Sequence, residues 1–177
     1  MFFEAGELKR VKRSGWWAAG VKDPETVAEH SWRASLVAFV LARMEKTNAE
    51  KIAVTAIFHD LPEARLLDRH KISTNYLKTP KEVEERVSSE QLSLLPAEAR
   101  PAELNAAEKI VLKDADFLEC ALQAREYDEI GYKAARDWLV RIGKKLRTKN
   151  GRKLFKELLR ETPTDWWAGL KQPLNEL

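Results

Sequence analysis

The sequence predicts an all-α protein that folds as one compact domain of roughly seven to nine helices. Apolar residues recur at intervals of three and four along most of the chain, and no stretch shows the sustained alternation of a strand. Only seven glycines and seven prolines interrupt 177 residues, which leaves room for long helices. A chain of this length can bury a substantial core, so we expect residues 1–177 to form a single domain.

The composition argues against two kinds of partner. The 31 basic and 28 acidic residues are largely interspersed, which gives a solvated surface and no footprint for a nucleic acid polymer. The longest apolar run, residues 36–42, is far too short to span a membrane. Cys120 is the single cysteine and no signal peptide is evident, so we expect a cytoplasmic location.

Capping signals place the first helices. A short helix is expected within residues 2–11, and the basic run at residues 9–13 is either its solvated end or an anion site. The capping-box pattern Thr26-x-x-Glu29 begins a long amphipathic helix. Asn48 can cap the next helix, which should end near Asp60 because a proline follows two residues later.

The second half of the chain continues in the same way. Residues 64–78 look irregular, and a loop of that length in a compact domain is often functional. Thr79-Pro80-Lys81-Glu82 predicts a capped helix with proline at its first position, running to about Leu94. A long helix follows from near Pro101 to about Ile130, with Gly131 as its end signal.

Two more helices are expected near residues 132–146 and 151–160, the second capped by Asn150. The C-terminal segment, residues 161–177, contains Trp166-Trp167. We expect this segment to make packing or dimer contacts.

Four polar residues within the apolar helical patterns predict a metal site: His30, His59, Asp60 and Asp116. A buried carboxylate needs a partner, and one divalent cation would satisfy all four groups. Imidazole and carboxylate ligands suit Mn, Co, Fe, Ni or Zn. Each residue alone is more often an ordinary core or surface group, so the metal prediction depends on their occurring together on three helices.

Around these positions the sequence resembles the HD-domain phosphohydrolases. Within that superfamily it is most similar to the 5′-deoxynucleotidase branch, which includes the YfbR and HD-domain-containing protein 2 groups. The resemblance covers about residues 5–160. The matching segments are Leu8 to Trp16, Val27-Ala28-Glu29-His30-Ser31, His59-Asp60-Leu61-Pro62-Glu63, Lys113-Asp114-Ala115-Asp116 and the residues that follow to Tyr127.

The resemblance implies a single HD domain, usually a homodimer, that converts deoxynucleoside 5′-monophosphates to deoxynucleosides and phosphate. It implies that His30, His59, Asp60 and Asp116 bind one divalent metal ion. Asp114 matches a variable position of the family, so Asp116 is the preferred ligand.

The same resemblance implies roles for four further residues. Glu63 matches the carboxylate that acts on the attacking water, and Asp68 matches an aspartate placed against the sugar. Arg13 and Trp16 match the phosphate-binding arginine and its neighbouring aromatic residue.

Departures from the family pattern leave alternatives at these positions. In the bacterial form the arginine and the tryptophan are adjacent, so here Arg10 could replace Arg13 and Trp17 could replace Trp16. Asp68 could instead pair with one of the basic residues that follow it. His70, the remaining histidine, is expected to be solvated.

The expected chemistry is metal-assisted hydrolysis of a phosphomonoester. The ion would polarise phosphorus and acidify a bound water, Glu63 would orient or deprotonate that water, and Arg13 would neutralise phosphate charge. Two alternatives stay open. One is another HD-type phosphohydrolase, acting on a nucleoside triphosphate or a cyclic-nucleotide phosphodiester, and the other is a non-catalytic helical metal-binding protein.

Overall fold

The structure is a computed structural model, and it describes residues 1–168 and residue 170. The described residues form ten α-helices and four short 3-10 helices, with no strand beyond one isolated bridge between Lys12 and Thr26. The all-α prediction is confirmed. Part of the C-terminal segment for which we predicted packing or dimer contacts, residues 169 and 171–177, lies outside the described residues.

The α-helices are distributed along the whole chain. Their bounds are α1 Phe2–Ala5, α2 Val27–Met44, α3 Ala49–Phe58, α4 Glu63–Leu66, α5 Lys71–Thr74, α6 Lys81–Ser93, α7 Ala106–Glu129, α8 Arg136–Gly143, α9 Lys149–Leu158 and α10 Asp165–Ala168. The number slightly exceeds the predicted range because α4, α5 and α10 are single turns of four residues. Two of these short helices, α4 and α5, lie within the segment 64–78 that we predicted to be irregular.

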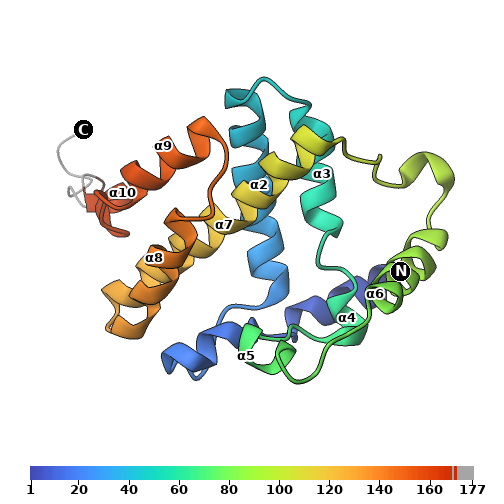
Figure 1. The fold of residues 1–177 in the computed structure, drawn as a ribbon, viewed down its shortest axis with the longest axis horizontal. Helices are drawn as coiled ribbons and strands as arrows, with labels where there is room; N and C mark the ends of the chain where they lie inside the picture. The colour runs from blue at the N-terminus through green and yellow to red at the C-terminus, as the bar shows by residue number, and fades with distance from the viewer. Residues whose placement is uncertain (169, 171–177) are drawn as a thin grey trace.

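Helix α7 runs through the middle of the molecule and packs against helices on two of its sides (Figure 1). It contacts α2 and α3 along one side and α8 and α9 along another, while α2 and α3 also pack against each other. Fully buried alanines such as Ala38, Ala56 and Ala115 lie in these contacts. Because alanine is small, the three helix axes can approach closely, which brings polar residues of the three segments into one region.

The capping signals are partly confirmed. Thr26 and Glu29 form the predicted capping box at the start of α2, and Asn48 caps α3 by accepting a hydrogen bond from the amide of Lys51. The box predicted at Thr79 is wrong, because Pro80 itself stands at the N-cap of α6 and makes no side-chain cap.

Two later helix starts also differ from the prediction. Helix α7 begins at Ala106 rather than near Pro101, because Asn105 and Glu108 form a reciprocal capping box there. Helix α9 is capped by Thr148 and not by Asn150. The Oγ1 atom of Thr148 accepts the amide hydrogen of Gly151 at 3.0 Å.

Asp114 ties the start of α9 to α7. Its buried carboxylate accepts hydrogen bonds from the backbone amide and the hydroxyl of Thr148, each at 2.7 Å, and from the amide of Arg147. A Cβ atom on Gly151 would lie 2.5 Å from Thr148 Oγ1 and 2.9 Å from Asp114 Oδ2. Asp114 is therefore fully used in holding these helices together, whereas Asp116 faces elsewhere.

None of the helices in the described part of the chain has the length and apolar character needed to cross a membrane.

We expect Gly151→Ala to lower the free energy of unfolding by about 1–3 kcal/mol, because the added methyl group would press on the buried Asp114 carboxylate. Urea denaturation followed by circular dichroism measures this difference. Gly6→Ala is the matched control, since a Cβ atom there would meet nothing within 4 Å. An equal effect of the two substitutions would contradict the packing described for Gly151.

Candidate metal centre

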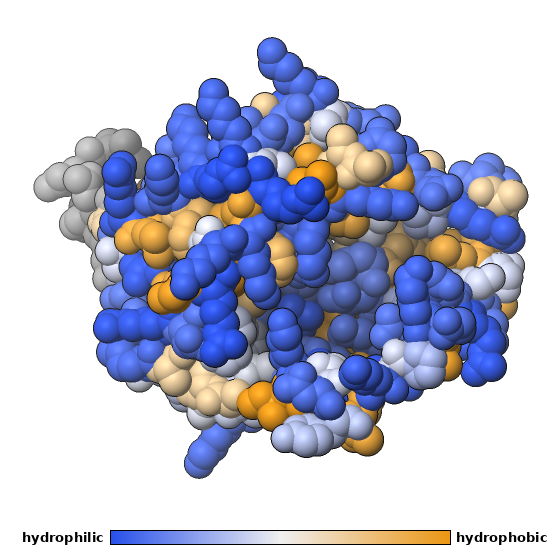
Figure 2. Space-filling model, in the orientation of Figure 1, coloured by the Kyte–Doolittle hydropathy of each residue, from blue (hydrophilic) through white to orange (hydrophobic). Residues whose placement is uncertain are grey.

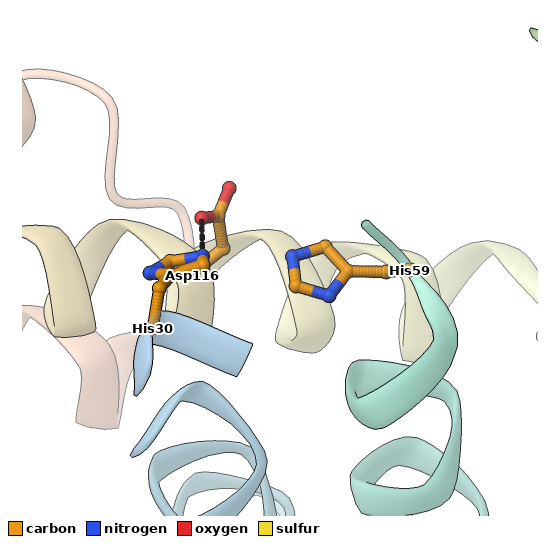
Figure 3. A group of neighbouring side chains, drawn as sticks. All are labelled: His30, His59 and Asp116. Atoms are coloured by element: carbon orange, nitrogen blue, oxygen red, sulfur yellow. Dashed lines mark ion pairs between the residues drawn. The ribbon is translucent and has the colours of Figure 1, made fainter. Parts of the chain in front are cut away.

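Three helices bring the ligand atoms of His30, His59 and Asp116 within 4.8 Å of one another. His30 lies in the first turns of α2, His59 directly follows α3, and Asp116 lies in the middle of α7. Figure 3 shows the three side chains pointing toward a common space. In that space the Nε2 atom of His30 lies 3.3 Å from Asp116 Oδ1.

The Nδ1 atoms of both histidines are held from behind. The Nδ1 atom of His59 lies 2.6 Å from the carbonyl oxygen of Ala56, and that of His30 contacts Glu119 Oε2. A carbonyl can only accept, so Nδ1 of His59 carries the hydrogen and its Nε2 lone pair is free. Both Nε2 atoms are buried without a hydrogen-bond partner, which is the state that a metal ligand requires.

Asp60 completes the set of residues predicted to bind metal. Its Oδ2 atom lies 3.3 Å from Nε2 of His59 and 3.5 Å from Nε2 of His30. Asp60 does not belong to the tighter group that His30 and His59 form with Asp116. Two imidazole nitrogens and two carboxylates are a donor set that fits a divalent transition metal.

The charges in this cluster depend strongly on one another. Burial alone lowers the pKa of His30, but the carboxylates of Asp116 and Glu119 outweigh it and raise that pKa to about 10. Burial likewise raises the pKa of Asp116, and here His30 and Lys113 outweigh it and hold the pKa well below its usual range. Without a cation, a proton on His30 therefore supplies the positive charge among these carboxylates.

Glu63 begins α4, three residues beyond Asp60. Burial, together with the charges of Asp60 and Asp68, raises the pKa of Glu63 to about 9. Its Oε2 atom is buried and has no hydrogen-bond partner. The structure thus places an unused carboxylate oxygen beside the candidate metal ligands, where an added positive charge would lower its pKa.

Arg13 and Asp68 lie together next to Asp60. Arg13 Nη1 is 3.4 Å from Asp60 Oδ2, and Arg13 Nε is 3.9 Å from Asp68 Oδ2. Asp68 also accepts the amide hydrogen of Ser14 at 2.9 Å. Arg10, the alternative that we considered, instead forms an exposed ion pair with a glutamate on the protein surface.

The backbone at Leu67 fixes the direction of Asp68. Leu67 has φ 62° and ψ 156°, a backbone conformation that residues other than glycine rarely adopt. Such a conformation costs about 1–3 kcal/mol and persists only when the surroundings enforce it. The hydrogen bonds between Ser14 and Asp68 provide that enforcement, since Ser14 Oγ also donates to the Asp68 carbonyl at 3.0 Å.

Trp16 supports the site from within the core. Its side chain is only 2% exposed and stacks on Trp138 with 5.1 Å between ring centroids. Its Nε1 atom donates to Glu25 Oε1 at 2.9 Å. The indole is thus enclosed by protein, while Trp17 is half exposed on the surface.

Two cavities meet at His59, Asp60 and Glu63. The first, of about 720 Å³, lies between α5, α7 and α8. We call it the lysine-side cavity because Lys71, Lys113 and Lys145 line it. The second, of about 770 Å³, lies between the segment 62–74 and α6. Of the predicted residues, Arg13 and Asp116 line only the lysine-side cavity.

Sequence reasoning gave no separate role to Glu119, which the structure places directly behind the site. Glu119 is fully buried and binds both His30 and Arg33, with Arg33 Nε donating to its Oε1 at 2.9 Å. A spacing signal was available: Arg33 follows His30 by three residues on α2, and Glu119 follows Asp116 by three on α7. Residues three apart share a helix face, so Arg33 lies on the same face of α2 as His30, and Glu119 lies on the same face of α7 as Asp116. If these two faces meet, the opposite charges of Arg33 and Glu119 can pair between the helices.

His70 is not freely solvated. It caps α5, its Nδ1 atom accepting a hydrogen bond from the amide of Ser73 at 3.2 Å. Its own amide donates to Ser14 Oγ at 2.9 Å. These contacts fasten the loop after Asp68 to the N-terminal segment and leave the ring at the edge of the lysine-side cavity.

Comparisons with known proteins found a matching family profile, similar sequences and similar structures. The HD domain family profile matches residues 5–158. The Homo sapiens protein named 5′-deoxynucleotidase HDDC2 is 32% identical over 141 residues, which cover 74% of this chain and 68% of that protein. The crystal structure of the genomics target APC5600 matches with TM-score 0.79 and 35% identity over 94% of this chain and 95% of that one. The predicted coding region AF1432 from Archaeoglobus fulgidus matches with TM-score 0.69 and 31% identity over the same shares of the two chains.

We expect the affinity for a divalent cation such as Mn²⁺ to rise with pH between pH 6 and 8. The pKa of His30 in the metal-free protein is raised to about 10, so a cation must displace its proton throughout this range. One displaced proton gives a gain of about tenfold per pH unit. Calorimetric titration at several pH values measures the slope, and a pH-independent affinity would contradict the assignment of His30 as a ligand.

We expect Glu119→Gln to weaken metal binding by about 10- to 100-fold, because the charge that orients the His30 ring is lost. Glu129→Gln on the exposed end of the same helix is the matched control. Both variants should keep the helical circular dichroism spectrum. Unchanged affinity in Glu119→Gln would show that the contact with His30 has no part in metal binding.

Proposed function

The chain belongs to the HD-domain family, and from this premise we propose that it is a metal-dependent 5′-deoxynucleotidase. The reaction is hydrolysis of a deoxynucleoside 5′-monophosphate to the deoxynucleoside and phosphate. The buried Nε2 atoms of His30 and His59, which form no hydrogen bond, and the free oxygen of Glu63 beside them carry the proposal. The likeness to the 5′-deoxynucleotidase HDDC2 supports the choice of substrate.

In this proposal His30, His59, Asp60 and Asp116 hold one divalent ion. When bound, the ion supplies Lewis-acid polarisation of the phosphate and acidification of a water. Glu63 orients that water and accepts its proton, which its position beside Asp60 allows. Its unpartnered Oε2 atom needs no existing hydrogen bond to be broken first.

Arg13 is proposed to bind the phosphate. Its guanidinium lines the lysine-side cavity, and the carboxylates around it hold its pKa above the usual range despite its burial. The fork of the guanidinium matches two phosphate oxygens. Asp68 positions Arg13 through its carboxylate and is the residue proposed to face the sugar.

Trp16 enters the proposal in a changed role. Because the indole is buried against Trp138 and bonded to Glu25, it positions the segment that carries Arg13. A direct contact between Trp16 and the substrate would require that packing to open. We therefore propose that Trp16 acts on the substrate only through Arg13.

The native ion is proposed to be one of Mn, Co, Fe, Ni or Zn, since the two nitrogen and two oxygen donors suit all of them. We also propose a cytoplasmic homodimer. A reducing location suits the single thiol of Cys120. The dimer is supported by an apolar stripe on the outer face of α2, made by the exposed side chains Trp32, Leu36, Phe39 and Val40.

A turnover panel tests the proposed function. After metal stripping and return of each divalent ion, we expect phosphate release from dAMP, dGMP, dTMP or dCMP and none from the stripped protein. Matched ribonucleotides measure the selectivity for deoxyribose. Turnover of dCTP or a cyclic nucleotide without any turnover of monophosphates would favour another HD-type phosphohydrolase, and metal binding with no turnover would favour a binding protein.

We expect Glu63→Ala to keep the fold and the metal but to lose activity by about 10²- to 10⁴-fold, because the group that takes the water proton is gone. Glu82→Ala, an exposed position on α6, is the matched control and should retain full activity. Metal content and kcat are measured on both. Normal turnover by Glu63→Ala would overturn the assignment of the base.

A further inference from the structure

Three lysines surround the outer part of the lysine-side cavity: Lys71 at the start of α5, Lys113 on α7 and Lys145 just after α8. We call these residues the lysine arc. None of them belongs to the metal centre, and the proposed reaction uses none of them. They come from three separate segments of the chain, so the fold and not a local run of basic sequence brings them together.

The lysine arc begins directly outside the candidate metal ligands. Lys113 Nζ lies 2.5 Å from Asp116 Oδ2, while the other oxygen of Asp116 faces His30. The ammonium groups of Lys113 and Lys145 lie over the ring of Phe117, 4.9 and 5.1 Å from its centroid. Both cations are thus fixed against the same aromatic ring, one step outward from Asp116.

Two of these cations have no acidic partner within the described residues. The ammonium groups of Lys71 and Lys145 form no hydrogen bond and no ion pair there. Lys113 and Arg141, by contrast, are compensated by Asp116 and Asp137. Burial, and then the charges of Lys71 and Lys113, lower the pKa of Lys145, so the lysines repel one another. An anion placed between them would remove that repulsion.

The scissile phosphate already has its own cation. Arg13 lies beside Asp60 and Asp68, whereas the lysine arc adjoins Asp116. A phosphate bound by Arg13 beside Asp60 and Asp68 uses a cation that is not part of the lysine arc.

The space between the two cationic regions fits the body of a nucleotide. Phe117, Trp138 and Ile142 give the lysine-side cavity an apolar wall, and its volume of about 720 Å³ is within the range of small-molecule sites. Figure 2 shows that this face is hollowed near the end of α3 and that hydrophilic side chains surround the hollow. A ligand with anionic groups at two places and an apolar base would match this lining.

We propose that the lysine arc is a second phosphate subsite, through which the protein binds nucleotides carrying a second phosphoryl group more tightly than simple monophosphates. The proposal rests on the proposed function for the position of the first phosphate. The second phosphoryl group can be attached to the sugar, as in a nucleoside 3′,5′-bisphosphate, or to the 5′-phosphate, as in a nucleoside diphosphate. Both present the same dianionic chemistry to Lys71 and Lys145.

Calorimetric binding to the metal-free protein tests the subsite without turnover. The probes are dAMP, 2′-deoxyadenosine 3′,5′-bisphosphate and dADP, and the variants are wild type, Lys71→Gln/Lys145→Gln and the control Lys156→Gln. Lys156 lies exposed on α9, away from both cavities. KM values of the metal-loaded protein for dAMP and the bisphosphate, and inhibition constants for dADP, give a second measurement of the same preference.

We expect at least one doubly phosphorylated probe to bind wild type about tenfold or more tightly than dAMP, the effect of one added charge-assisted contact. The advantage should vanish in Lys71→Gln/Lys145→Gln and survive in Lys156→Gln. Tighter binding of the bisphosphate alone would show that the lysine arc binds a phosphate attached to the sugar. Tighter binding of dADP alone would show that it binds a phosphate attached to the 5′-phosphate.

The proposal is overturned if no doubly phosphorylated probe exceeds dAMP by either measurement, or if the advantage persists in Lys71→Gln/Lys145→Gln. Equal weakening of all three probes in that variant would also overturn it, because the lysines would then grip the scissile phosphate or attract anions in general. Failure of the proposed function gives a different result. In that case the metal-loaded protein does not hydrolyse dAMP. The calorimetric comparison of the three probes measures binding alone, so its result does not depend on turnover.

Discussion

The buried contact between Glu119 and His30 is the interaction on which the rest of the site depends. It joins α7 to α2 in the interior, and Arg33 neutralises the second oxygen of the same carboxylate. A buried carboxylate without these partners would cost several kcal/mol, so the two helices are held at the separation that the contact requires. That separation in turn brings Asp116 of α7 opposite the Nε2 atom of His30. One ion-pair network therefore sets both the packing of the central helices and the direction of a candidate metal ligand.

The helical frame converts short sequence motifs into a convergent site. Buried alanines let α2, α3 and α7 approach closely, and His59 and Asp60 extend from the end of α3 toward the other two helices. The N-terminal segment then closes over this region, because Ser14 fastens both Asp68 and the amide of His70. The hydrogen bonds of the neighbouring Ser14 thus help to place Arg13 beside Asp60. The unusual backbone of Leu67 is a local cost of this closure, offset by the hydrogen bonds on either side of it.

The sequence was sufficient for the all-α fold and for the family, because helical periodicity and short motifs are local properties. The sequence also predicted His30, His59, Asp60 and Asp116 as a group, because each is a polar residue in an apolar helical pattern. The structure brings these four residues together. The start of α7 was missed because the cap at Asn105 outweighs the proline upstream. The burial of Trp16 and the lysine arc could not be read from the sequence. Both depend on which distant segments meet: Trp16 packs on Trp138, and the three lysines converge only after α5, α7 and α8 have assembled.

The meeting of two cavities at His59, Asp60 and Glu63 has a consequence for the order of events in turnover. In phosphoryl transfer the entering and departing oxygens lie roughly in line on opposite faces of phosphorus. In the proposed reaction, a centre that opens in two directions would let a nucleoside leave through one cavity while the next water arrives through the other. Water and nucleoside would then not need to exchange places through one opening.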